Sequence, residues 1–158
     1  IQDDPKTILQ IEDVSGLRFK GPNIVFYRRQ YESDPTDSLV FIHSDANLGR
    51  YTALIYLNSP NQCTGGTAFW KMRGLGWERH PDLEMLQKAR LVDCPGTWDI
   101  INDIGNEEDK WKKTRFVEMK WNRLLLFDSF LFHSRWPRVP FGDEINNARL
   151  IKCFFLNP

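Results

Sequence analysis

Two histidines and one aspartate are the residues of this sequence whose types and spacing best suit chemistry. His43 and Asp45 stand two positions apart at the end of an apolar run over 39–42, and His133 follows the apolar stretch 124–127 much further along the chain. Two imidazoles and one carboxylate on one face of a metal ion form the facial arrangement that holds non-haem Fe(II) and leaves coordination positions open. The three residues therefore predict a metal site, against the alternative that each histidine is an ordinary core or surface residue.

Short runs of β-branched and aromatic residues, bounded by Gly, Pro, Asn or Asp, supply the elements that must position these side chains. Such runs predict strands at residues 8–12, 23–28, 39–43, 51–58, 67–71, 123–128 and 149–156. Many short strands are typical of β-sandwiches and barrels. The pattern therefore predicts a mainly β fold.

Residues 72–121 interrupt this pattern. Helical spacing of apolar residues predicts one helix over 81–92, and a second short helix is predicted over 97–104. The charged segment 105–113 is expected to be solvated surface. We therefore expect a helical insertion between core strands.

Length and composition limit the class of protein. The 158 residues, 41% of them hydrophobic, fit a single domain over 1–158. The 21 basic and 21 acidic residues cancel, so we expect neither a general nucleic-acid binder nor a membrane-bound protein. The three cysteines lack C-x-x-C spacing, which argues against a disulfide scaffold or a structural zinc site and favours a soluble protein of the reducing cytoplasm.

Motifs around the candidate ligands follow one another in a characteristic order. They are His-Ser-Asp at 43–45, Tyr-Leu-Asn at 56–58, Gly-Gly at 65–66, Arg-Leu-Leu-Leu-Phe at 123–127, His133 and a strand opened by Arg149. In this order the chain resembles the 2-oxoglutarate/Fe(II)-dependent dioxygenases, in their prolyl-4-hydroxylase-like branch, and within it a microbial and phage group. The resemblance covers about residues 23–156. It implies a double-stranded β-helix (jelly-roll) fold that uses Fe(II), 2-oxoglutarate as co-substrate, and O₂.

The resemblance also implies a role for each matching residue. His43, Asp45 and His133 match the iron ligands and are the expected catalytic residues. Halogenating relatives replace the carboxylate with a small residue, so the presence of Asp45 favours hydroxylation. The implied reaction hydroxylates a C–H bond of an amino acid, a peptide or protein residue, or a small metabolite, and releases succinate and CO₂.

Three further residues match contacts to 2-oxoglutarate. Arg149 matches the basic residue that binds its distal carboxylate, and the parallel donors of a guanidinium suit that group. Tyr56 matches a tyrosine that donates to the same carboxylate, and Tyr27 matches a second co-substrate contact.

Strand alternation offers an independent test of these roles, because residues two apart on a strand share a face. If Arg149 points inward, then Ile151, Cys153 and Phe155 do so too, and Lys152 points outward. An outward Lys152 would not be the partner of the co-substrate carboxylate.

The expected substrate is a small molecule or a peptide, with Arg135 and Trp77 as possible contacts. Two other functions stay open. One is a catalytically inactive jelly-roll binding module, and the other is a cupin-like metalloenzyme that does not use 2-oxoglutarate. A cupin usually carries more histidines near its first ligand, where only His43 is found here.

Overall fold

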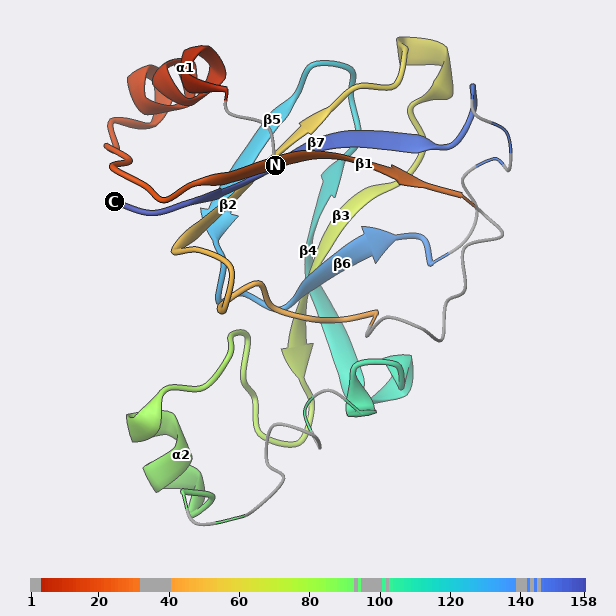
Figure 1. The fold of residues 1–158 in the computed structure, drawn as a ribbon. Coiled ribbons are helices and arrows are strands. Elements are labelled where there is room, and N and C mark those ends of the chain that lie inside the picture. The colour runs from red at the N-terminus through yellow and green to blue at the C-terminus, as the bar shows by residue number, and fades with distance from the viewer. Residues whose placement is uncertain are drawn as a thin grey trace.

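Two antiparallel sheets form the body of the computed structural model, which describes residues 4–31, 41–92, 94, 101, 103–138, 142, 144 and 146–158 (Figure 1). The first sheet contains, in spatial order, β1 (Ile24–Gln30), β7 (Arg149–Leu156), β2 (Tyr51–Tyr56) and β5 (Leu124–Asp128). The second contains β4 (Trp111–Glu118), β3 (Gly66–Met72) and β6 (His133–Trp136). The mainly β fold predicted from the sequence is thereby confirmed.

The two sheets pack face to face around one buried cluster. Leu54 and Ile151 from the first sheet meet Phe69 from the second in this cluster. The rings of Phe69 and Phe127 pack edge to face across the gap, with centroids 5.1 Å apart. We call the two faces that meet here the inner faces and the opposite faces the outer faces.

Helix α1 (Pro5–Ser15) covers the outer face of the first sheet. Its buried residues Ile8 and Ile11 pack against Val25, Phe154 and Leu156. Burial of these apolar side chains on both partners is what holds the helix on the sheet.

The strand predicted over residues 8–12 is wrong, because those residues belong to α1. The Asp4 carboxylate accepts a hydrogen bond from the Thr7 backbone N–H, and Pro5 occupies the first turn, where its missing N–H costs nothing. Gly16, at φ 72°, ends the helix in the left-handed conformation. These end signals outweigh the β-branched content of the short segment.

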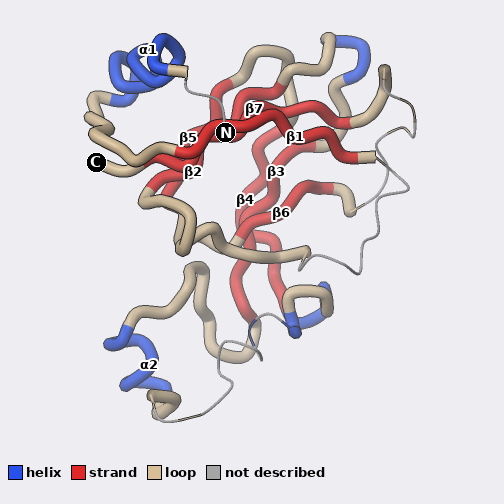
Figure 2. The backbone as a smooth tube through the Cα atoms, in the orientation of Figure 1, coloured by secondary structure: helices blue, strands red, loops and turns tan. Residues whose placement is uncertain are grey.

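The outer face of the second sheet is covered by the segment that follows β3. Helix α2 (Leu83–Ala89) lies at the end of the molecule away from α1 (Figure 2). Its Met85 and Leu86 pack against a buried cluster that contains Trp70 and Trp111. The helix predicted over 81–92 is thus confirmed in its central part. Of the helix predicted over 97–104, Ile101, Asp103 and Ile104 are helical, and the other residues lie outside the described ones.

The sequence patterns did not predict two strands of the second sheet. β4 lies inside the expected insertion and pairs with β3 throughout, so only the part of 72–121 before Trp111 is free of core strands. All of β4 between Trp111 and Val117 is exposed, as on an edge strand, and it therefore lacks an apolar alternation. β6 is only four residues long and begins at a candidate ligand, His133.

Short 3₁₀ helices complete the description, at Pro60–Gln62 and Glu108–Lys110. Of the strand predicted over 39–43, residues 39 and 40 lie outside the described ones, and His43 forms an isolated bridge rather than a ladder. None of the described helices has the length and apolarity needed to cross a membrane.

Candidate metal centre

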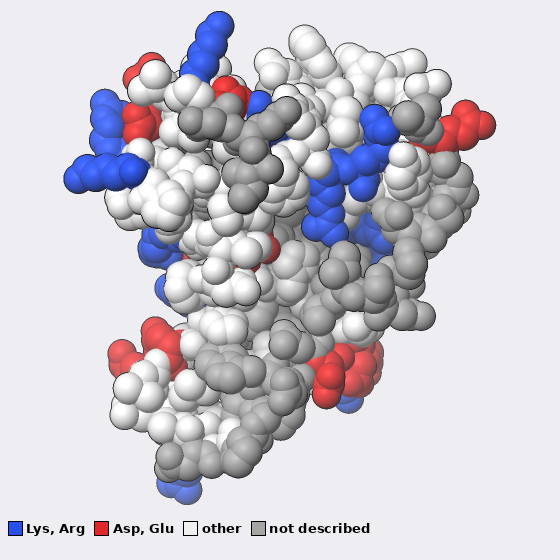
Figure 3. Space-filling view, viewed as in Figure 1, with Lys and Arg blue, Asp and Glu red and all other residues white. Residues whose placement is uncertain are grey.

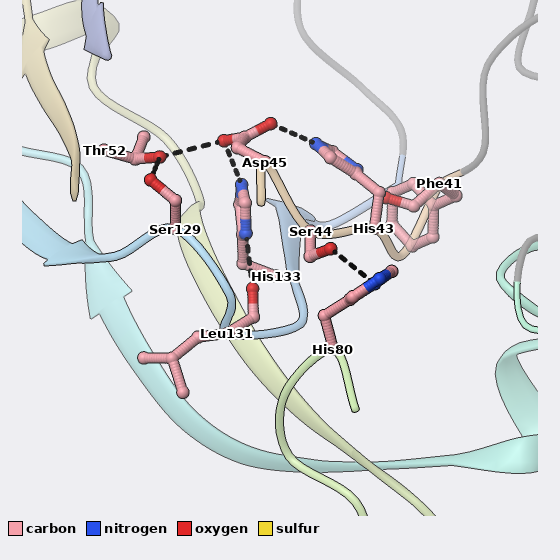
Figure 4. A network of polar contacts seen from close by, with 9 residues as sticks. All are labelled: Phe41, His43, Ser44, Asp45, Thr52, His80, Ser129, Leu131 and His133. Carbon is pink, nitrogen blue, oxygen red and sulfur yellow. Dashed lines mark hydrogen bonds and ion pairs between the residues drawn. The ribbon is translucent and has the colours of Figure 1, made fainter. Parts of the chain in front are cut away.

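The three predicted ligands converge on one point. Their ligating atoms all lie within 4.8 Å of one another. His133 Nε2 is 3.2 Å from Asp45 Oδ2, and His43 Nε2 is 3.8 Å from Asp45 Oδ1, so each imidazole faces a different carboxylate oxygen (Figure 4). Two nitrogens and a carboxylate gathered in this way can hold a divalent transition-metal ion.

Backbone hydrogen bonds fix the segments that carry these side chains. The His43 N–H donates to the His133 carbonyl at 3.1 Å, and the His133 N–H donates back to the His43 carbonyl at 2.8 Å. The Asp45 N–H donates to the Ser129 carbonyl at 2.8 Å. The spacing of the ligands is therefore set by the main chain and does not depend on side-chain rotamers alone.

Both imidazole rings are oriented by the nitrogen that would not bind metal. His43 Nδ1 lies 3.0 Å from the Phe41 carbonyl oxygen, and His133 Nδ1 lies 2.9 Å from the Leu131 carbonyl oxygen. A carbonyl only accepts, so each Nδ1 carries the proton and donates it. Each Nε2 then keeps its lone pair for a ligand, which is the usual arrangement of metal-binding histidines.

The Asp45 carboxylate is held by a pair of buried hydroxyl groups. Thr52 Oγ1 donates to Asp45 Oδ2 at 3.1 Å and lies 2.8 Å from the Ser129 hydroxyl. Both hydroxyl-bearing residues are almost completely buried. Thr52 thus supports the Asp45 carboxylate from the inner face of β2.

The protonation states of the cluster suit a metal ligand set. Desolvation and the neighbouring His133 lower the pKa of His43 to about 4, although 34% of its side chain is open to solvent. Burial raises the pKa of Asp45, but hydrogen bonds and charge from the two histidines and Thr52 hold it below its ordinary 3.8. At neutral pH, His43 is therefore neutral and Asp45 is ionised, which are the forms that bind metal.

Arg149 and Tyr56 meet on the inner face of the first sheet. Arg149 is only 3% exposed, and its guanidinium lies over the Tyr56 ring at 5.5 Å from the centroid. It also donates to the Gln30 side-chain oxygen, while the Tyr56 hydroxyl is 2.7 Å from Thr67 Oγ1. Burial lowers the pKa of Arg149, and hydrogen bonding to Tyr56 opposes that shift.

The predicted alternation of β7 is confirmed. Arg149, Ile151, Cys153 and Phe155 are all buried on the inner face. Burial raises the pKa of the Cys153 thiol to about 12, and Asp45 lies near enough to add to the shift. The inner residues of β7 therefore extend from Arg149 toward the ligand cluster.

Tyr27 lies on the opposite side of the sheet from the cluster. It pairs in register with Lys152, is 53% exposed, and has the Lys152 ammonium 5.0 Å from its ring centroid. Lys152 also forms an ion pair with Asp4 at the start of α1. The prediction of an outward Lys152 is confirmed, and the structure does not bring Tyr27 to the site.

The two expected substrate contacts lie on different faces of the second sheet. Trp77 belongs to the buried cluster on the outer face of the second sheet, so the structure does not bring it to the ligand cluster. Arg135 pairs with Thr67 and stands two residues after His133, which places it on the inner face, half-buried. Arg135 therefore stays a candidate.

Arg28 reaches the site although sequence reasoning passed over it. It pairs in register with the inner residue Ile151, and its charge is among the influences that lower the pKa of His43 and of Arg149. Phe26, two residues earlier, packs on the inner cluster as well. The alternation of the predicted 23–28 strand was the signal for Arg28, since Tyr27 and Arg28 cannot share a face.

His80 also lies beside the cluster. Its Nδ1 is 3.3 Å from the Ser44 hydroxyl, and burial lowers its pKa. Together with Asn47 and His43, it lines a pocket of about 320 Å³. The sequence Arg-His-Pro around His80 indicates only a loop, so no local pattern could have placed it here.

One protein family matches this chain. The model of a family described as "Family of unknown function (DUF6445)" covers residues 37–150, which is more than half of the 158 residues. The chain therefore belongs to this family, and the matched region includes all three cluster residues and Arg149. No curated protein and no solved structure matches the chain.

Proposed function

We propose that this protein is an Fe(II)- and 2-oxoglutarate-dependent dioxygenase that hydroxylates a C–H bond. The observation that carries the proposal is the convergence of two Nε2 atoms and one carboxylate, each held by a further hydrogen bond. This donor set fits Fe(II) and leaves coordination positions open. When bound, Fe(II) and 2-oxoglutarate supply the activation of O₂, with succinate and CO₂ as co-products.

The strand order supports a jelly-roll as the underlying fold. The first sheet has four strands, and in the second the segment at His43 bridges to β6 on the edge opposite β3. With that segment counted as a strand, each sheet has four, and a jelly roll has eight strands in two sheets.

The residues of the site would have separate roles. His43, Asp45 and His133 would hold the metal, and the partial exposure of His43 leaves a way in from solvent. Arg149 would bind the distal carboxylate of the co-substrate, with Tyr56 packed against its guanidinium. Because Arg149 is buried, water competes weakly for its donors, so the charge-assisted contact is strong.

The test is anaerobic titration of the Fe(II)-loaded protein with 2-oxoglutarate, followed by the visible charge-transfer band of the chelate. We expect a band that needs both components and is lost in His133→Ala. In Arg149→Gln, the 2-oxoglutarate requirement should rise about 10- to 150-fold, because a hydrogen bond to a charged group contributes about 1.5–3 kcal/mol.

The matched control is Lys152→Gln, which removes a cation from the outer face of the same strand and should leave the titration unchanged. Metal binding without a band in folded protein would contradict the proposal and favour a metalloenzyme that does not use 2-oxoglutarate. Failure to bind metal at all would favour a binding module.

A further inference from the structure

Arg28 stands on β1 beside the proposed co-substrate site, on the inner face that it shares with Arg149. The inner residues of β1 pair with the inner residues of β7, Arg28 with Ile151 and Gln30 with Arg149. Gln30 accepts from Arg149, so the next inward position toward the ligand cluster on β1 is that of Arg28. Arg28 lies close enough to influence the pKa of His43, of Arg149 and of Cys153.

Arg28 brings a positive charge to the inner face of β1. Within the part of the chain that the structure describes, no hydrogen bond or ion pair joins Arg28 to a carboxylate. Figure 3 shows Lys and Arg side chains gathered where β1 and β6 lie in that view.

Among the residues that the structure describes, the charges of the proposed complex leave Arg28 without a counterion. A divalent metal with the Asp45 carboxylate carries one net positive charge, and Arg149 adds another. The two carboxylates of 2-oxoglutarate neutralise both. A partly buried guanidinium without an opposite charge is unfavourable, so this site should attract a second anion.

We propose that Arg28 binds an oxyanion group, a carboxylate or a phosphate, of the primary substrate, so that the substrates of this site are anionic. This inference rests on the proposed function for the place of 2-oxoglutarate. The planar fork of a guanidinium suits both oxyanions. A substrate held there would lie beside His43, the ligand that is open to solvent.

The experiment measures probe anions without knowledge of the natural substrate. The protein is loaded with Mn(II) and saturating 2-oxoglutarate, and acetate, methylphosphonate and acetamide are added in turn. Paramagnetic relaxation of each methyl resonance reports how much of the probe lies near the metal. Acetamide is the neutral control, and the two anions distinguish a carboxylate site from a phosphate site.

We expect the relaxation of at least one anion to exceed that of acetamide and to fall about tenfold in Arg28→Gln, the loss of one charge-assisted contact. Arg28→Lys should retain part of the effect, since it keeps the charge. Arg29→Gln is the matched control, because Arg29 is the next residue on β1 and points outward, exposed.

Three results would overturn the inference: equal relaxation of all three probes, no change in Arg28→Gln, or a higher 2-oxoglutarate requirement in Arg28→Gln. The last would make Arg28 a co-substrate residue. The chelate band is recorded on the same variants. A normal band without anion selectivity contradicts this inference but leaves the proposed function standing. If anion binding depends on Arg28 but no chelate band appears, the anion site is supported and the proposed function is contradicted.

Discussion

The two faces of β7 show how one strand serves two tasks. On the inner face, Arg149 and Cys153 extend toward the candidate metal centre. On the outer face, Lys152 pairs with Asp4 and Phe154 is buried beneath α1. Because consecutive residues point to opposite faces, the groups that serve the site and the groups that hold the helix alternate along the chain. Substitutions one position apart should therefore separate function from stability.

The largest effect is expected inside the cluster. His133→Ala removes one of three ligands, and we expect the native affinity for Fe(II) or Co(II) to be lost while the two sheets stay assembled. Metal titration by calorimetry, with circular dichroism on the same sample, measures both. Retention of native affinity by a folded His133→Ala protein would place the metal elsewhere.

On the outer face, Phe154→Ala should lower the free energy of unfolding by about 3–5 kcal/mol, because a fully buried ring is lost beneath α1. Urea denaturation measures this loss. The metal affinity of the folded protein should stay at its native value. A fall in affinity while the protein remains folded would show that the two faces of the first sheet are not independent.

A smaller effect on metal affinity is expected at Thr52, which donates a hydrogen bond to the candidate ligand Asp45. Thr52→Val keeps the shape of the side chain but removes the hydroxyl that donates to Asp45. Metal affinity should fall about 10- to 100-fold, as is typical when a partner of a metal ligand is lost. Thr114→Val on β4 is the control, since its hydroxyl donates to the Phe69 carbonyl. Equal affinities for both variants would mean that the Ser129 contacts hold the carboxylate without Thr52.

The smallest effect concerns the ion pair between α1 and β7. Asp4→Asn preserves the helix cap but removes the charge, and should cost about 1 kcal/mol or less. Burial raises the pKa of Asp4, but Lys152 and Thr7 hold it below 3.8, so the contribution should be present above pH 3.8 and vanish as the carboxyl protonates at lower pH. Hydrogen bonding to Asp4 raises the pKa of Lys152 above 10.5 despite desolvation, so at the basic end the contribution is lost only above that pH.

Urea denaturation of the native protein and Asp4→Asn at several pH values measures the difference. A difference that persists unchanged at pH values low enough to protonate Asp4 in the native protein would contradict the ion pair as its source.

The parts of the fold that could be read from the sequence are strands with buried residues on at least one face. β2, β5 and β7 have such patterns, and alternation predicted that Arg149 shares a face with Ile151, Cys153 and Phe155. The exposed edge strand β4 has no such pattern. Its place depends on pairing with β3, which is a tertiary contact that a local pattern does not record.

The candidate site, like the fold, was predicted only in part. The three candidate ligands were proposed from residue type, spacing and the order of the surrounding motifs, and the structure brings them together. The structure does not bring Tyr27 to the site, because a shift of one residue on a strand moves a side chain to the other face, and Arg28 is the residue that faces inward. Trp77 and His80 lie in segments whose course is set by packing against distant elements, so their neighbours could not be derived locally.

The position of β7 has a consequence for synthesis of the protein. β7 is the last strand that the structure describes, yet it lies between β1 and β2, and it carries Arg149. Until residues 149–156 leave the ribosome, the facing edges of β1 and β2 stay unpaired and the first sheet cannot close. A nascent chain that stops short of β7 would therefore lack both a complete first sheet and the guanidinium of Arg149.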